Sequence, residues 1–471
     1  MQCSWKSVVL LALASVAIQY TAIRTLTSTS YLLCPAHSNS SSAPFSADSA
    51  YERDDLRGGC DEEHLSNSTR RTQVLLLTTT RCGSTFIGQL LNQHPDVFYL
   101  FEPLYHVQAS IVPRIHMASD RQVMLGASRD LLWSLFQCDL YALESYVRPA
   151  PANHMLDNLF RQGASRNLCQ PPVCQAFKPG ESLEEWQCKK KCSPLNLTLA
   201  AQACREKPHV AMKTVRMPVV EDLRPLLEDP RLNIKVIQLV RDPRGILSSR
   251  IETFRDLYRL WGIWQATGRR PHTLETWQFT TICDDFFNSV STALSQPAWL
   301  KGRYMLVRYE DLSRNPLQKT KEIYDFVGLS MTPSVEEWIR VNTRSTSEVK
   351  DKYGTRRDSA ANAESWRLKL PFDMVEFSQG VCKRALWQLG YREARSAQEL
   401  RNMNVSLVQD KTFVPGLQPA ARELQQLSTP LSLSHNNPHG STGSSRILAK
   451  SVRDSQVART RLRARKRPLS L

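Results

Sequence analysis

The residues best suited to chemistry lie within residues 73–102, where a short loop follows an apolar, β-prone run at residues 74–77. The loop reads RCGST (residues 81–85), and after it apolar residues recur at the spacing of one helical face. Backbone N–H groups at the start of that helix, residues 83–86, are expected to be unpaired, with the positive end of the helix dipole behind them. The pattern therefore predicts an anion-binding site.

The kind of anion is indicated by what the loop lacks. A nucleoside-triphosphatase loop would read GxxxxGK[ST], whereas here the cation, Arg81, precedes the glycine. No acidic strand end that could hold a metal is obvious either. Phosphoryl transfer usually recruits magnesium, so the loop fits better with transfer of a singly charged group such as sulfuryl.

The elements around the loop predict how it is positioned. Residues 74–101 read as strand, loop, helix and strand, which is one βαβ unit. Residues 209–214 and 234–240 are further strands, and residues 304–312 read as a structural strand running into a helix. The turn at residues 241–245 follows the most continuous apolar strand, at the carboxyl end where ligands bind in such sheets. We therefore predict an α/β fold with a central parallel sheet flanked by helices.

Two motifs together resemble a known family. RCGSTF with NQHPDVFYLFEP, and VIQLVRDPRGILSS at residues 236–249, are similar to the 5′-phosphosulfate and 3′-phosphate motifs of Golgi carbohydrate 6-O-sulfotransferases. The resemblance covers roughly residues 70–410. It implies a P-loop-like sulfotransferase fold and transfer of sulfuryl from 3′-phosphoadenylyl sulfate (PAPS), with no metal required.

The resemblance also implies an acceptor, the 6-hydroxyl of galactose in keratan sulfate and related N-acetyllactosamine glycans. The motifs concern the donor, so N-acetylglucosamine and N-acetylgalactosamine, as in chondroitin, stay open as acceptors. A glycan-binding relative without catalysis is a third reading. Arg81, Lys213 and Glu102 together favour an enzyme.

Site residues follow from the matched positions. Glu102 is the expected general base, and Arg81 and Lys213 are expected to neutralise charge on the bridging oxygen. A carboxylate that merely pairs with Arg81 is the alternative for Glu102, and His106 is the next candidate base. The donor-binding residues implied are Thr80, Arg81, Cys82, Gly83, Ser84, Thr85 and Phe86, and Arg241, Asp242, Pro243, Arg244, Gly245, Ile246, Leu247, Ser248 and Ser249.

Three further features carry expectations. Cys82 stands where the family usually has serine; we expect its side chain to point away from the donor and its thiol to be unusually acidic. Residues 352–356 resemble a loop that closes over the nucleotide, or are a solvated basic loop. The tryptophans at 261, 264 and 277 could stack on sugars, although core packing is commoner in helices.

The cysteines indicate an oxidising compartment. Of twelve, Cys3 and Cys82 are set aside and ten remain for disulfides. Several crowd an insertion at residues 138–204, for which a zinc site is the alternative, disfavoured because the spacings lack a clean CxxC pair. The insertion is expected either to form an acceptor-facing wall or to be a pinned loop away from substrate. Four glycosylation sequons, at Asn39, Asn67, Asn196 and Asn404, agree with a luminal body.

The segments outside the body predict a membrane-anchored protein, and the family resemblance implies that it is a Golgi enzyme. Residues 1–6 are a cytoplasmic tail, residues 7–23 an uncharged apolar signal anchor, and residues 24–71 a luminal stem. A cleaved signal peptide is the alternative to the anchor. The sulfotransferase domain spans 72–410. The sequons and cysteines then indicate a single-pass type II protein with its catalytic domain in the lumen.

Residues 411–471 are expected to be a disordered basic tail. From residue 446 onward the tail has nine Lys/Arg against one Asp, a charge of +8, which is half of the formal +16. The body is therefore only modestly basic, which permits an acidic glycan partner and indicates no nucleic acid. Homo-oligomerisation is left open.

Overall fold

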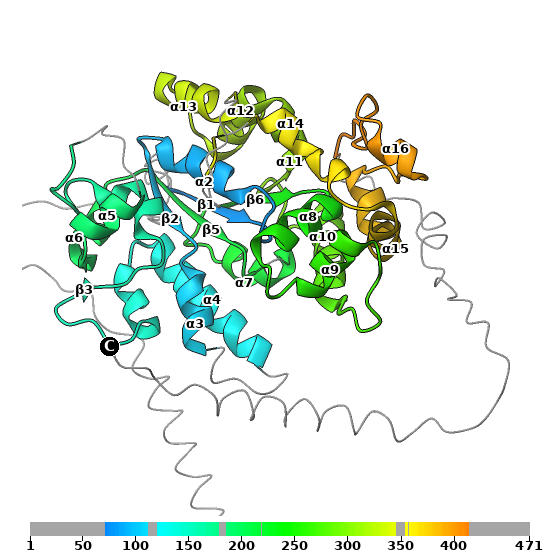
Figure 1. Cartoon of the computed structure of the whole chain (residues 1–471). Helices are drawn as coiled ribbons and strands as arrows, with labels where there is room; N and C mark the ends of the chain where they lie inside the picture. The colour runs from blue at the N-terminus through cyan, green and yellow to red at the C-terminus, as the bar shows by residue number, and fades with distance from the viewer. Residues whose placement is uncertain are drawn as a thin grey trace, which may run out of the picture. The chain divides into compact units, whose positions relative to one another are not determined.

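The fold is built on a five-stranded, wholly parallel sheet in the order β2-β5-β1-β6-β7 (Figure 1). The strands are β1 Thr72–Leu77, β2 Val97–Phe101, β5 His209–Thr214, β6 Ile234–Val240 and β7 Tyr304–Arg308. The predicted central parallel sheet is confirmed. Because all strands run the same way, their carboxyl ends meet at one edge of the sheet.

The structure is a computed structural model, and it describes residues 71–111, 120–178, 185–217, 219–344, 354–356 and 358–413. The chain divides into Met1–Ser66 and Asn67–Leu471, and all described residues belong to the second unit. The predicted cytoplasmic tail, signal anchor, nearly all of the stem and most of the basic tail lie outside the described residues. Within the described ranges, no helix has the length and apolarity needed to cross a membrane.

Helices cover both faces of the sheet, because side chains alternate along each strand. Val74 and Leu76 of β1 enter one apolar core, whereas Leu75 and Leu77 enter the other. The helices are α2 Ser84–Gln93, α3 Leu104–Ile111, α4 Asp120–Phe136, α5 Glu185–Lys191, α6 Leu197–Arg205, α7 Arg224–Leu227, α8 Pro243–Thr253, α9 Arg259–Thr267, α10 Trp277–Leu294, α11 Tyr309–Arg314, α12 Pro316–Val327, α13 Pro333–Thr343, α14 Ser359–Ala363, α15 Phe372–Leu389 and α16 Ala397–Arg401. Helices α2, α8, α10 and α15 contribute to the first core, and α3, α4 and α6 to the second.

The insertion consists of short elements held by disulfides. It contains the 3₁₀ helices η3 Leu140–Tyr146, η4 Gln162–Ala164 and η5 Arg166–Cys169, followed by α5 and α6. A two-stranded antiparallel pair, β3 Met155–Leu156 and β4 Leu195–Asn196, closes it. Because so little regular structure is present, covalent links supply much of its rigidity.

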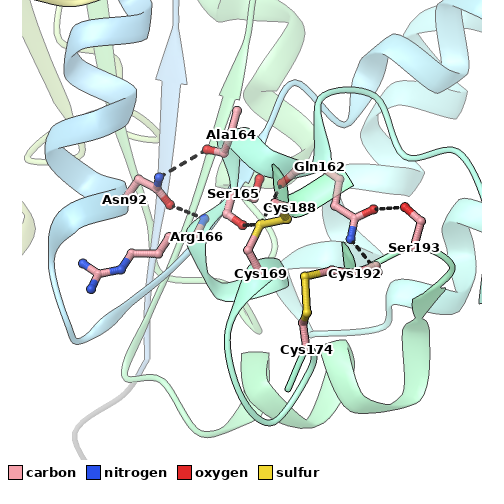
Figure 2. The surroundings of a disulfide bond; sticks show 10 residues. All are labelled: Asn92, Gln162, Ala164, Ser165, Arg166, Cys169, Cys174, Cys188, Cys192 and Ser193. Atoms are coloured by element: carbon pink, nitrogen blue, oxygen red, sulfur yellow. Dashed lines mark hydrogen bonds between the residues drawn. A yellow bond between two sulfur atoms is a disulfide. The ribbon is translucent and has the colours of Figure 1, made fainter. Parts of the chain in front are cut away.

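Eight of the ten cysteines predicted to pair do so. The disulfides are Cys138–Cys204, Cys169–Cys188, Cys174–Cys192 and Cys283–Cys382. Figure 2 shows the second and third of these side by side, with Gln162 donating a hydrogen bond from Nε2 to the Cys192 carbonyl at 3.2 Å. The zinc alternative is therefore wrong for the insertion, since all its cysteines are in disulfides. Cys34 and Cys60 lie outside the described residues.

Candidate functional site

A cavity of about 300 Å³ opens where the carboxyl ends of the strands meet. It contacts residues that follow β1, β2, β5, β6 and β7, which is the expected location for a ligand in a parallel sheet. Twelve of the residues predicted from the sequence line it: Thr80, Arg81, Gly83, Ser84, Thr85, Phe86, Glu102, Lys213, Arg241, Gly245, Ser248 and Ser249.

The loop after β1 presents backbone to the cavity. Gly83 has φ +93°, and a Cβ there would lie 2.3 Å from the Tyr309 ring, so both conformation and space require glycine. Gly83 is also the N-cap of α2, with no side-chain cap hydrogen bond. The N–H groups at the start of α2 therefore retain capacity for an anion. One expectation is corrected: the Phe86 N–H donates to the Gly83 carbonyl at 3.0 Å.

Two arginines, Arg81 and Arg241, connect the loop to α8. Arg81 donates from Nε to Ser249 Oγ at 3.0 Å, and Arg241 donates from Nη1 to the Arg81 carbonyl at 3.0 Å. The Arg241 guanidinium lies 4.4 Å from the centre of the Tyr309 ring. Its Nε is buried without a hydrogen-bond partner among the described residues. A buried donor at a cavity wall suits an anionic ligand, because an unpaired donor is costly.

The other residues of the second motif support the turn from behind. Arg244 is fully buried and pairs with Asp242 at 2.7 Å, while Asp242 caps α8 by accepting from the Arg244 N–H. Arg244 also donates to Gln379 at 2.7 Å. These two side chains and those of Pro243, Ile246 and Leu247 do not line the cavity. Their side chains are thus placed to hold the turn rather than to face a ligand.

Cys82 faces the interior, as expected, and donates from Sγ to the Leu239 carbonyl at 3.3 Å. It is fully buried and does not line the cavity. The expectation of an acidic thiol is wrong, because burial raises the pKa of Cys82 to about 12. Desolvation outweighs the helix terminus at this position.

Glu102 and Lys213 form a buried ion pair at the other side of the cavity. Lys213 Nζ lies 2.5 Å from Glu102 Oε1, and Arg216 bonds the second carboxylate oxygen, Oε2. Pairing with Arg81, the alternative read from the sequence, is wrong: the partners are Lys213 and Arg216. Glu102 also adopts φ +47°, an uncommon conformation for a non-glycine residue and one that clusters at functional sites.

The charges set the basicity of this pair. Burial acts to raise the pKa of Glu102, but Lys213 and Arg216 outweigh it, and the pKa lies below its usual value. Burial lowers the pKa of Lys213 to about 8, even though Glu102 opposes the shift. The pair therefore joins a carboxylate that stays ionised to an ammonium that deprotonates within an accessible pH range.

His106 is placed away from the cavity. Its Nε2 accepts a hydrogen bond from the Phe160 N–H at 3.0 Å, and burial lowers its pKa to about 4. The ring is thus neutral and occupied. It does not line the cavity, unlike Glu102.

Several lining residues were missed from the sequence. Arg216 and Tyr309 lie just beyond strands β5 and β7, so the rule that ligands bind at carboxyl strand ends could have found them. Tyr309, which we took as structural, accepts a hydrogen bond from Asn362 at 2.8 Å. Asn362 and Trp366 come from distant segments that carried no signal.

The expectations for the three tryptophans and for the loop at residues 352–356 have different outcomes. Trp261 and Trp264 are buried in the core, whereas Trp277 is exposed. Gly354 and Thr355 of the predicted nucleotide loop line the cavity, and residues 352 and 353 lie outside the described residues.

Comparisons with known proteins identify the family of this chain. A family model described as "Sulfotransferase domain" matches residues 71–390. Carbohydrate sulfotransferase 1 of Danio rerio is 61% identical over 88% of this chain and the whole of the relative. The Homo sapiens protein of that name is 58% identical with the same coverage. Carbohydrate sulfotransferase 3 of Mus musculus is 44% identical over 72% of each chain.

A solved structure, the sulfotransferase domain of the Synechococcus PCC 7002 olefin synthase, is a looser match. It is 20% identical, with a TM-score of 0.33, over 65% of this chain and 93% of that one. This score is too low to support any conclusion about the site.

Burial of Cys82 leads to a prediction about its reactivity. Because the protonated, buried thiol is a poor nucleophile, alkylation of the folded protein should leave Cys82 unmodified. Peptide mass spectrometry after iodoacetamide treatment, with and without denaturant, measures this. Cys82→Ser, which retains a hydrogen-bond donor, should preserve activity. Rapid labelling of Cys82 in the folded protein would contradict the buried placement.

Proposed function

Because the chain belongs to the sulfotransferase family, and within it to the carbohydrate sulfotransferases, we propose that it transfers a sulfuryl group from PAPS to the 6-hydroxyl of galactose in keratan sulfate. One observation carries the proposal: a cradle for an anionic donor and the Glu102–Lys213 pair share one cavity. The choice of galactose rests on the overall resemblance. N-acetylglucosamine and N-acetylgalactosamine are the rival acceptors.

The donor fits the cationic side of the cavity. The N–H groups at the start of α2 and the hydroxyls of Ser84 and Thr85 would hold its 5′-phosphosulfate, since they lie at a helix N-terminus. Arg241 and Ser249 would hold its 3′-phosphate, and the unpartnered Nε of Arg241 supplies a ready donor. When bound, PAPS supplies the sulfuryl group. The cradle recruits no metal in this proposal.

The acceptor hydroxyl would approach Glu102, which takes its proton as general base. Arg81 and Lys213 would stabilise negative charge on the bridging oxygen. As Lys213 turns its ammonium toward that charge, Glu102 loses one of its two cationic partners and becomes more basic. Arg216 keeps the carboxylate oriented meanwhile. A carboxylate with a lowered resting pKa can in this way act as a base when the donor is bound.

The disulfides support an oxidising compartment, and we place the enzyme in the Golgi lumen. Attachment to the Golgi membrane through residues 7–23 belongs to this proposal. The exposed side chain of Asn404 is accessible for glycosylation.

The function is tested by incubating the secreted luminal chain with labelled donor and desulfated keratan, chondroitin or N-acetyllactosamine chains. Label on the galactose 6-position of keratan is expected. Preferential labelling of N-acetylgalactosamine, or of N-acetylglucosamine, would replace galactose. Absence of transfer to every glycan by a folded, donor-binding chain would favour a binding protein instead.

Arg241 should select the 3′-phosphate of the donor. Arg241→Ala is expected to weaken binding of the 3′-phosphorylated nucleotide by about 2–5 kcal/mol, because a charged partner is removed from a buried site. Adenylyl sulfate, which lacks that phosphate, should bind nearly as before. Calorimetric titration compares the two nucleotides, and equal losses for both would remove Arg241 from this role.

Glu102→Gln tests the base. The amide keeps the shape and one of the two accepting oxygens but neither the charge nor the basicity, so kcat should fall about 10²–10⁴-fold with near-normal affinity for the product nucleotide. Steady-state kinetics beside calorimetry give both values. If Glu102 only orients Lys213 and Arg216, nucleotide affinity should suffer most. A near-normal kcat would exclude Glu102 as the base.

The lowered pKa of Lys213 predicts that activity falls at alkaline pH. The ammonium is charged below its pKa of about 8 and neutral above it, so kcat/KM should decline as pH rises through about 8. Lys213→Arg, whose guanidinium stays charged, should move that decline to higher pH in whatever activity it retains. A wild-type profile that stays level up to about pH 10 would show that the Lys213 charge is not needed.

A further inference from the structure

The helix α5 begins beside the cavity. Its first residue, Glu185, accepts a hydrogen bond from Arg161 Nε at 2.7 Å, and a second bond joins Arg161 Nη2 to Glu185. Arg161 lines the cavity, where its guanidinium lies 4.6 Å from the centre of the Phe101 ring. Lys213 lies 4.1 Å from the same ring. The wall on the Lys213 side therefore continues directly into α5.

The outer face of α5 has an unusual composition. Trp186 is 65% exposed, and Lys189, Lys190 and Lys191 are exposed on the following turn. Within the helix the acidic residue Glu185 pairs with Arg161, and Lys189 and Lys190 give the outer face two positive charges. An exposed indole beside lysines suits a ligand that offers sugar faces and anionic groups together.

Trp186 is not part of the small core beneath α5. The small core beneath α5 consists of Phe177 and the half-cystines Cys169, Cys174, Cys188 and Cys192. Trp186 points out of that core.

The face is also held rigidly. Two disulfides tie α5 and the residue after it to the preceding loop, as Figure 2 shows. A Cβ on Gly163 of η4 would lie 2.3 Å from the Glu185 carbonyl, so η4 and α5 meet backbone to backbone. Rigid presentation lowers the entropy that binding must overcome.

We propose that Trp186, Lys189 and Lys190 form an extended subsite that binds a polyanionic stretch of the acceptor glycan outside the cavity. The inference rests on the proposed function. The acceptor glycan is the occupant because each transfer adds a negative charge to the chain that leaves the cavity. Helix α5, whose first residue pairs with the cavity-lining Arg161, carries the opposite charge. Lys191 is left out, because its Nζ already lies 4.9 Å from the centre of the Phe177 ring.

The test compares a short oligosaccharide acceptor with a long, partly sulfated chain of the same repeat, using the full luminal protein. Trp186→Ala and the double variant Lys189→Ala/Lys190→Ala should each raise KM for the long acceptor about 3- to 10-fold. The kcat, KM for the donor and KM for the short acceptor should stay at wild-type values. Added salt should weaken long-chain binding less in the double variant, because fewer charges take part.

Two controls keep the result specific. Trp186→Phe retains an aromatic ring and should largely restore long-chain KM. Lys301→Ala/Lys321→Ala removes the same charge from two other exposed positions, one of them just before β7 at the opposite end of the strands, and should have no effect. Thermal unfolding confirms that each variant is folded.

An unchanged ratio of long- to short-acceptor KM in the α5 variants would overturn the subsite while leaving the proposed function intact. Failure of wild-type protein to sulfate either acceptor would instead remove the proposed function. Loss of binding to anionic lipid vesicles in these variants, with glycan kinetics unchanged, would assign the face to a membrane and overturn the glycan.

Discussion

The buried ion pair between Glu102 and Lys213 is the interaction on which the rest of the site depends. Both side chains are nearly enclosed, with 11% and 3% of their surface exposed. Removing either partner of such a pair typically costs about 3–5 kcal/mol, because the remaining charge has no substitute for water. Arg216 supplies the partner for the second oxygen of the Glu102 carboxylate. The wall of Phe101 and Arg161 is arranged around these charges.

The order of the strands explains why the pair exists. Strand β5 lies between β1 and β2, so Phe101 of β2 is the register partner of Lys213. Glu102, the next residue, therefore reaches Lys213 and not Arg81, which follows β1. Nothing in the local sequence of residues 73–102 reveals that a strand from more than a hundred residues later separates the two halves of the βαβ unit. The pairing of Glu102 was for that reason misjudged, although Glu102 and Lys213 were both identified.

Much of the fold and of the donor side could be predicted, because local sequence encodes it. Apolar runs marked the strands, and Gly83 marked the loop through its required backbone conformation. The wall beside Glu102 depends on contacts between distant segments, and Arg161 carried no comparable local signal. Trp366, which lines the cavity near Gly245, carried none either. The predicted acidity of the Cys82 thiol was wrong for a different reason. The sequence showed that Cys82 lies near a helix N-terminus, but it did not show that the side chain is completely buried. The sequence also did not reveal a buried network behind the donor turn. There Glu310 accepts hydrogen bonds from the Asp242 N–H and the Tyr391 hydroxyl, and burial raises the pKa of Glu310 to about 7.

The disulfides of the insertion hold one wall of the cavity and not the other. The donor cradle is formed by β1, α2 and α8, which contain no half-cystine. Arg161 and α5, in contrast, take their positions from segments that are crosslinked by Cys169–Cys188 and Cys174–Cys192. The shape of that wall therefore depends on an oxidising environment, whereas β1, the loop after it and the start of α2 carry no such crosslink.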